Sequence, residues 1–106
     1  MTGQAVVLVY TLFGDVDVAE RIGGQMVEER LAACVNIGAP CTSLYRWNGT
    51  IERAVEIPVL FKTAPDRRDA LMARLAALHP YDVPAVLALS ETDAVHPPFA
   101  AWVAAQ

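Results

Sequence analysis

The feature that most constrains this fold is an Asn48-Gly49 pair set between two strand-like runs. Both residues tolerate positive φ, which the tight turn of a two-residue β-hairpin requires. The run before the pair is Cys41–Trp47, and the run after it is Thr50–Thr63. The pair therefore predicts an antiparallel hairpin in the middle of the chain. Pro58 lacks an N–H, so it should lie at a bulge or an unpaired edge.

Upstream of this hairpin the sequence predicts a strand, a helix and the start of a second strand. The run Ala5–Leu12 is nearly continuous in apolar and β-branched residues, which is typical of a strand buried on both faces. Asp17, followed three residues later by Glu20, resembles a capping box and should open the helix. The second strand begins with Ala32–Ile37, and a GAP triplet interrupts it before Cys41.

Downstream of the hairpin the pattern is again a helix and then a strand. Pro65 is well placed in a first helical turn, and Pro80 should end that helix because the residue before a proline avoids the helical region. Val83–Leu89 reads as the last strand of the sheet. The expected apolar faces are Leu71, Leu75 and Leu78 on this helix, and Phe99, Trp102 and Val103 on a short final helix opened by Pro97-Pro98.

The predicted order is β-α-β-β-α-β with a C-terminal helix, an α+β plan of the ferredoxin-like type in one domain spanning residues 1–106. Such a domain has one antiparallel sheet, with both main helices on one face and strands two and four at the edges. The other face mixes apolar and polar groups and needs a cover. The open edges also favour a partner, so the plan predicts an oligomer.

Composition and charge exclude several classes of function. Charged residues make up 19% of the chain, below the usual quarter, which indicates that another subunit covers part of the surface. The net charge of -4 and the lack of a basic stripe argue against nucleic acid as a partner. The sequence has neither the long apolar run of a membrane span nor a secretory signal. With only two cysteines, reduced thiols and a cytoplasmic location are expected.

Several motifs in this order closely resemble the CutA family, the divalent-cation tolerance proteins: ERLAACVNI, SLYRWNGTIE, FKT, LHPYDVP and FAAWV. The resemblance runs from about Val6 to Val103. It implies a ferredoxin-like subunit, a compact homotrimer, and a link to tolerance of copper and other divalent metals. The sequence departs from the family pattern at Ala85, where a glutamate is frequent, at Phe99, where tyrosine is common, and at Cys41.

Two residues are candidate metal ligands. Cys34 would supply a thiolate suited to Cu(I) or zinc, or it is a buried structural thiol. His79 would bind metal through a neutral imidazole, or it caps the end of the second helix. No cofactor is expected to be required, and copper or another divalent metal ion is the candidate ligand. The sequence does not decide whether Cys34 and Cys41 form a disulfide.

A second candidate site is a cleft between subunits, formed by Glu56, Lys62, Tyr81 and Asp82. Glu56 and Lys62 are six residues apart on one strand and therefore face the same side. They form either an ion pair between subunits or the floor of a pocket for a small anion. HPYDVP is read first as a rigid turn and second as one wall of the cleft. Tyr45, Trp47 and Trp102 are candidate interface residues, and the hairpin should lie against a neighbouring subunit.

The leading functional prediction is therefore a non-enzymatic homotrimer that binds a metal ion or a small ligand between subunits. Cys34 and His79 are the only conceivable nucleophile pair, and no hydrolase pattern accompanies them. The alternative is a signalling module like the nitrogen-regulatory PII proteins, which bind a small anionic ligand between subunits. An RNA-binding RRM shares the element order, but its third-strand motif is absent.

Overall fold

The structure is a computed structural model that describes residues 4–89 and 92–106. Its sheet contains five strands: β1 (Val7–Phe13), β2 (Cys34–Ile37), β3 (Cys41–Trp47), β4 (Thr50–Thr63) and β5 (Val86–Ala88). Its α-helices are α1 (Val16–Glu28), α2 (Arg68–Leu78), which follows a 3₁₀ turn at Pro65–Arg67, and α3 (Pro97–Ala105). The predicted β-α-β-β-α-β order with a C-terminal helix is confirmed.

The sheet is antiparallel, and β4 and β1 are its central strands. The strand order is β2-β4-β1-β5, and β3 pairs with the far half of β4. The second predicted strand, now β2 and β3, and the fourth, now β5, therefore lie at the edges as expected. One half of β4 pairs with β1 and β2, and the other half pairs with β3, so β4 runs through the whole length of the sheet.

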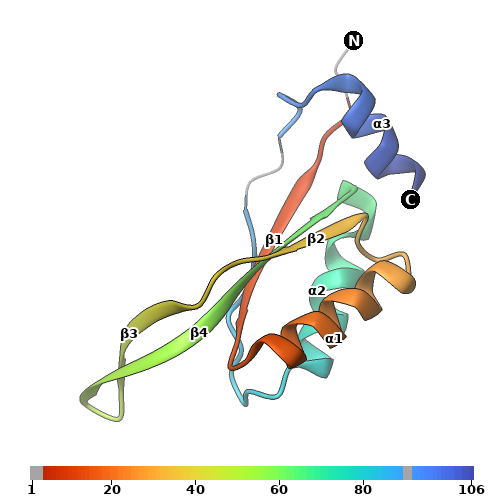
Figure 1. The fold of residues 1–106 in the computed structure, drawn as a ribbon. Helices are drawn as coiled ribbons and strands as arrows, with labels where there is room; N and C mark the ends of the chain where they lie inside the picture. The colour runs from red at the N-terminus through yellow and green to blue at the C-terminus, as the bar shows by residue number, and fades with distance from the viewer. Residues whose placement is uncertain (1–3, 90–91) are drawn as a thin grey trace.

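The predicted hairpin forms an arm, defined here as β3 with residues 50–56 of β4. Asn48 and Gly49 have φ values of 50° and 78°, the left-handed conformations that a type I′ turn needs. The pairing runs from Trp47 opposite Thr50 to Cys41 opposite Glu56. Figure 1 shows the arm extending away from the helices, beyond the rest of the sheet.

A bulge joins the arm to the rest of the sheet. Three residues, 38–40, lie opposite only two, Ile57 and Pro58, between the pairings of β2 and of β3 with β4. The Pro58 carbonyl accepts a hydrogen bond from the Gly38 N–H at 2.8 Å, so the missing N–H of Pro58 also faces the bulged strand. A side chain on Gly38 would come within 3.0 Å of the Pro58 ring. The predicted bulge at Pro58 is confirmed.

Helices α1 and α2 lie side by side on one face of the sheet (Figure 1). The alternate residues of β1 and β4 that point to this face are buried against them. The largest fully buried side chains of this core include Phe13, Phe61, Ile22, Met26, Leu71 and Leu75. The predicted apolar face of α2 therefore contributes to the main core, with Leu71 and Leu75 buried in it and Leu78 packed against it.

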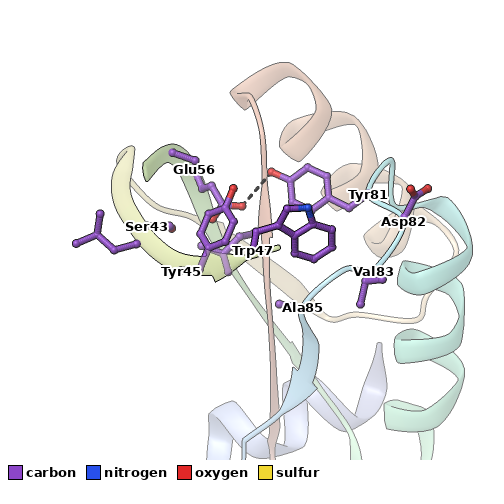
Figure 2. A pocket seen from close by; sticks show the side chains of 11 residues that line it. Ser43, Tyr45, Trp47, Glu56, Tyr81, Asp82, Val83 and Ala85 are labelled. Carbon is purple, nitrogen blue, oxygen red and sulfur yellow. Dashed lines mark hydrogen bonds between the residues drawn. The ribbon is translucent and has the colours of Figure 1, made fainter. Parts of the chain in front are cut away.

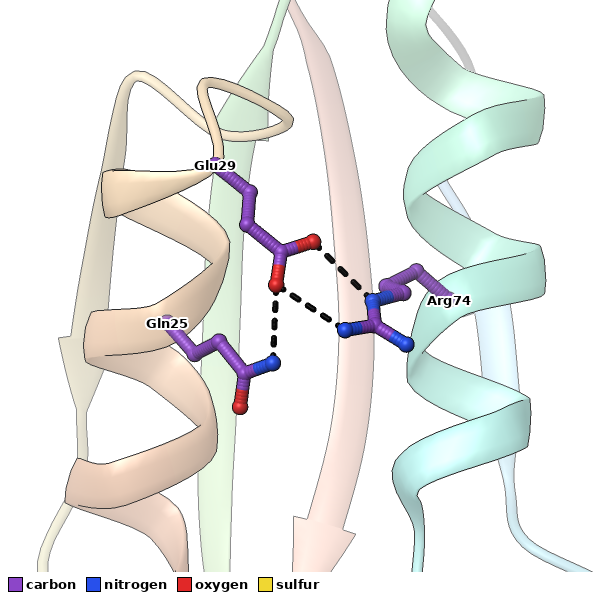
Figure 3. Close-up of polar contacts among 3 residues, drawn as sticks. All are labelled: Gln25, Glu29 and Arg74. Atoms are coloured by element: carbon purple, nitrogen blue, oxygen red, sulfur yellow. Dashed lines mark hydrogen bonds and ion pairs between the residues drawn. The ribbon is translucent and has the colours of Figure 1, made fainter.

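An ion pair joins the exposed sides of these two helices (Figure 3). Arg74 of α2 donates from Nε and Nη2 to the two carboxylate oxygens of Glu29, at 2.9 and 3.0 Å. Gln25 donates to the same carboxylate at 2.7 Å. These contacts, the Arg74 hydrogen bond first, lower the pKa of Glu29.

Helix α3 covers one end of the opposite face of the sheet. Its buried residues are Ala100 and Val103, which pack with Val6 and Ala33 in a second core cluster. Trp102 stays half-exposed, and its ring packs against Phe99, so the two lie on one side of the helix as predicted. Arg67 donates to the Val103 and Ala104 carbonyls at the end of α3, where cations are favoured.

Two predicted boundaries differ from the structure. The N-cap of α1 is Asp15, whose side chain accepts from the Val18 N–H at 2.9 Å, while Asp17 lies inside the first turn. The last strand is limited to β5, which pairs with β1 over three residues, because Val83 and its neighbours leave the sheet to form a loop. No helix in the described ranges is long and apolar enough to span a membrane.

Candidate functional site

The main concave surface lies between the arm and the loop that follows α2. This arm groove has a volume of about 740 Å³. Figure 2 shows the arm side chains facing the loop side chains across it. The lining residues come from β1, from the arm and from the loop: Leu12; Ser43, Leu44, Tyr45, Trp47, Ala54 and Glu56; Tyr81, Asp82, Val83 and Ala85. Leu44 borders the groove only from its position between Ser43 and Tyr45, because strand alternation directs its side chain to the other face of the arm.

A hydrogen bond connects the loop to the arm at one end of the groove. The Tyr81 hydroxyl donates to a carboxylate oxygen of Glu56 at 2.9 Å (Figure 2). Burial, followed by this bond to Glu56, raises the pKa of Tyr81 to about 12. The phenol is therefore protonated at neutral pH and remains a donor to the carboxylate.

His79 connects the loop after α2 to strand β1. Its Nε2 lies 2.7 Å from the Leu12 carbonyl oxygen. A carbonyl can only accept, so Nε2 carries the proton, and Nδ1 is free to accept from the Tyr81 N–H at 3.2 Å. The ring also stacks on Phe13 with a centroid distance of 4.6 Å and contacts the Tyr81 ring at the same distance. Both nitrogens are thus engaged, and metal ligation by His79 would require these bonds to break.

The groove is aromatic and acidic. Tyr45 and Trp47 lie on its arm wall and remain 45% and 55% exposed in a single chain. Glu56 and Asp82 supply two carboxylates. No lysine, arginine or histidine lines the groove among residues 4–89 and 92–106. Such a surface suits a cationic group more than an anion.

Lys62 is separated from the other residues of the predicted cleft. It faces the same side of β4 as Glu56, but the two are six positions apart, which is about 20 Å along the strand. Its ammonium lies 5.8 Å from the centre of the Phe99 ring of α3. The structure therefore brings Glu56, Tyr81 and Asp82 together at the groove and places Lys62 at the other end of the sheet.

Cys34 lies beside Lys62 and not near His79. Cys34 of β2 and Lys62 of β4 are register partners. Burial raises the pKa of the Cys34 thiol, and the positive charge of Lys62 offsets part of that rise. Cys41 instead pairs with Glu56, about 20 Å further along β4. Cα atoms beyond about 7 Å cannot be bridged. Both thiols are free, and the distance between Cys34 and Cys41 is too large for a disulfide within one chain.

The described ranges contain no cluster of three or more histidine, cysteine, aspartate or glutamate side chains placed to hold a metal ion. Cys34 and His79 thus do not form a joint site within one chain. The half-exposed Trp102, predicted at an interface, packs against Phe99 with a ring distance of 5.8 Å.

Sequence reasoning missed two features of the groove. The strand alternation that places Tyr45 and Trp47 on one face also places Ser43 there, so this residue could have been found by its spacing. Ala85 also lines the groove. The position where the resemblance led us to expect a glutamate thus lies in the groove, and in this chain it carries no charge.

The comparisons with known proteins agree on one family. The family described as "CutA1 divalent ion tolerance protein" matches residues 7–106. The divalent-cation tolerance protein CutA of Pyrococcus horikoshii is 36% identical over 97 residues, which cover 92% of this chain and 93% of that protein.

Solved structures agree with this match. The crystal structure of CutA from Xylella fastidiosa aligns with a TM-score of 0.88 and 39% identity, covering 92% of this chain and 93% of the other. A CutA from Archaeoglobus fulgidus, described as periplasmic, aligns with a TM-score of 0.87 and 31% identity over 92% of this chain and 94% of its own. The chain belongs to the CutA1 family of divalent ion tolerance proteins.

Proposed function

We propose that this chain acts in divalent-cation tolerance as a non-enzymatic, cytoplasmic homotrimer that binds a metal ion or a small ligand between subunits. One observation carries the proposal: the arm exposes large apolar side chains on both of its faces. Tyr45 and Trp47 are exposed on one face, and Leu44, Ile51 and Val55 on the other. Exposed apolar patches of this kind mark interaction surfaces, and aromatic residues are enriched in them.

The groove chemistry favours a cation as the ligand. Glu56 and Asp82 provide negative charge, and the aromatic rings provide faces that attract cations. The PII-like alternative needs an anionic ligand. The groove residues of a single chain offer it no positive charge, so we do not adopt that alternative.

The proposal of a non-enzymatic role is supported by the distance between Cys34 and His79, the two groups that could form a nucleophile pair. Lys62 of β4 is paired with Leu8 of β1 on one side and with Cys34 of β2 on the other. Cys34 therefore lies level with the Leu8 end of β1. His79 stacks on Phe13 at the other end, about 16 Å along the strand. A general base must come within about 3 Å of the thiol it activates.

Metal binding on this proposal requires ligands from more than one chain, because one chain lacks a cluster of three ligand-bearing side chains within its described residues. Cys34 repeats three times in a trimer, and thiolate is a ligand that Cu(I) prefers. The raised pKa of Cys34 means that metal must displace a proton from the thiol. Affinity should therefore fall as pH drops.

Subunit number and retained ligand are measured together by native mass spectrometry of protein from cell extract. A trimer mass is the expected result. A monomer mass at micromolar concentration, confirmed by light scattering, would overturn the proposed assembly.

Metal binding is tested by Cu(I) titration of Cys34→Ser and Cys41→Ser, each checked for an intact assembly. The two variants make a matched pair because both thiols lie on the β2–β3 edge of the sheet. We expect weaker binding only in Cys34→Ser. Equal affinity in both variants and in the unmodified protein would remove thiol ligation and leave the acidic groove as the candidate metal site.

A further inference from the structure

The arm groove has a carboxylate on each of its two walls and aromatic rings between them. Glu56 belongs to β4 in the arm, and Asp82 belongs to the loop after α2. Figure 2 shows these two side chains on opposite sides of the groove, with the rings of Trp47 and Tyr81 between them. The groove therefore has two separate negative points and an aromatic middle.

Glu56 can bind a cation without losing its contact with the loop. The Tyr81 hydroxyl donates to one carboxylate oxygen, Oε2, at 2.9 Å. Within the residues that the structure describes, the second oxygen, Oε1, has no donor of its own. A carboxylate accepts several hydrogen bonds, so an N–H donor of a ligand can join the Tyr81 hydroxyl there.

A bare metal ion fits this arrangement poorly. Calcium and magnesium need a shell of oxygen ligands around one point, and the two carboxylates of the groove come from separate walls. Residues 4–89 and 92–106 contain no cluster of three or more histidine, cysteine, aspartate or glutamate side chains that could hold a metal ion. The ring faces attract a cation but do not ligate a metal.

An organic cation fits the groove in size and in chemistry. Its volume of about 740 Å³ is typical of a pocket for a small organic molecule and far exceeds the space that one ion needs. Aromatic faces such as those of Tyr45 and Trp47 bind ammonium groups. Leu12, Val83 and Ala85 add apolar surface that can contact a hydrocarbon chain.

We propose that the arm groove binds a small organic diammonium ion, a hydrocarbon chain with an ammonium group at each end. One ammonium pairs with Glu56 and the other with Asp82, and the chain lies against Tyr45 and Trp47. The inference rests on the proposed binding of a small ligand and names the chemical class of that ligand. Cys34, at the other end of the sheet, remains the separate candidate for metal.

Calorimetric titration of the unmodified protein at neutral pH tests the ligand class. Diaminobutane and diaminohexane are compared with butylamine and hexylamine, which have the same chains and one ammonium fewer. At least one diamine should bind about fivefold more tightly than its monoamine, the upper end of what an exposed ion pair contributes. Magnesium chloride should displace that diamine no better than sodium chloride of equal ionic strength. Failure of both diamines to bind, equal affinity of diamines and monoamines, or specific displacement by magnesium would overturn the inference.

Charge-neutralising variants test the two carboxylates. Glu56→Gln and Asp82→Asn keep the side-chain shape and remove the charge. The matched control is Glu28→Gln, because Glu28 is exposed on α1, away from the arm. Each groove variant should lose about fivefold in diamine affinity, and the control should lose none.

Circular dichroism and light scattering check the fold and the subunit number of each variant. Asp82 is exposed, so Asp82→Asn keeps the test valid if Glu56→Gln disturbs the loop. Unchanged diamine affinity in the folded groove variants would refute the inference.

Trp47 shows whether the diamine enters the groove. In a Trp102→Phe background it is the only tryptophan, because the chain contains two. Its emission should change with the same midpoint as the calorimetric titration, and binding without such a change would refute the inference. A trimer that binds Cu(I) through Cys34 and no diamine defeats this inference alone. A monomer that binds the diamine in the groove defeats the proposed assembly and leaves the inference standing.

Discussion

Replacing His79 with alanine tests how the loop wall of the groove is held. The imidazole is only 7% exposed and connects the loop after α2 to β1, through Leu12 and Phe13, while it also contacts Tyr81 within the loop. Each of its two hydrogen bonds contributes roughly 1 kcal/mol net. The two ring contacts add about 0.5 kcal/mol each at the lower end of the usual range, which is appropriate because Tyr81 is partly exposed. We therefore expect His79→Ala to lower the free energy of unfolding by about 3 kcal/mol.

The assay is urea unfolding followed by circular dichroism, at one fixed chain concentration because assembly adds to stability by mass action. A loss of this size lowers the urea midpoint by about 1–3 M with an unchanged slope. His79→Gln keeps an amide donor for the Leu12 carbonyl and loses the ring with its contacts to Phe13 and Tyr81, so its midpoint should fall in between. His96→Ala is the control, since His96 is exposed and makes no side-chain cap at α3.

The reasoning is refuted if His79→Ala shifts the midpoint no further than His96→Ala. It is also refuted if His79→Ala leaves stability intact and abolishes metal binding, because that result would make the imidazole a ligand and not a brace for the loop.

Three further predictions concern single polar groups. Thr11→Val should raise the free energy of unfolding by about 1 kcal/mol, because the Thr11 hydroxyl is buried without a hydrogen-bond partner within the described residues; a lower urea midpoint would contradict this. The lowered pKa of Glu29 means that its stabilising effect is present above the ordinary glutamate value of about 4.3 and lost as pH falls through the folded value. The midpoint difference between the unmodified protein and Glu29→Gln should therefore vanish in acid. The raised pKa of Tyr81 means that its contribution is present below the ordinary tyrosine value of about 10 and lost as pH rises toward about 12; an ultraviolet titration should lack this last phenolate step in Tyr81→Phe.

The sequence predicted the architecture because its strongest signals were local. The Asn48-Gly49 turn, Pro58 and Pro80 each impose a backbone restriction that few folds can avoid, and all three appear where they were predicted. The N-cap of α1 was misplaced because Asp17 with Glu20 matches the spacing of a capping box, whereas Asp15, the actual N-cap, is followed three residues later by Val18. Only the bond from Asp15 to the Val18 N–H distinguishes them, and that bond depends on where the preceding strand ends.

The site was predicted only in part because its contacts join distant segments. Strand alternation correctly placed Glu56 and Lys62 on one face, but it could not show that α3 would fold back over Lys62. The partner of His79 is the carbonyl of Leu12, 67 residues earlier, and a backbone carbonyl leaves no signal in a sequence. Tyr81 and Glu56 were predicted to line a cleft between subunits, and the structure adds a direct hydrogen bond between them within one chain.

The arm needs support from other parts of the protein to remain ordered. It has seven register pairs, from Cys41–Glu56 to Trp47–Thr50, and reaches about 20 Å beyond the bulge. An isolated two-stranded hairpin is marginally stable in water, and the helices cover the other half of the sheet (Figure 1). The loop braced by His79 supports one face of the arm through Tyr81 and Glu56. In the proposed homotrimer, a second copy would cover the other face, where Leu44, Ile51 and Val55 are exposed. On this argument, order in the arm and assembly of the protein are one coupled equilibrium, and a change at either face shifts both.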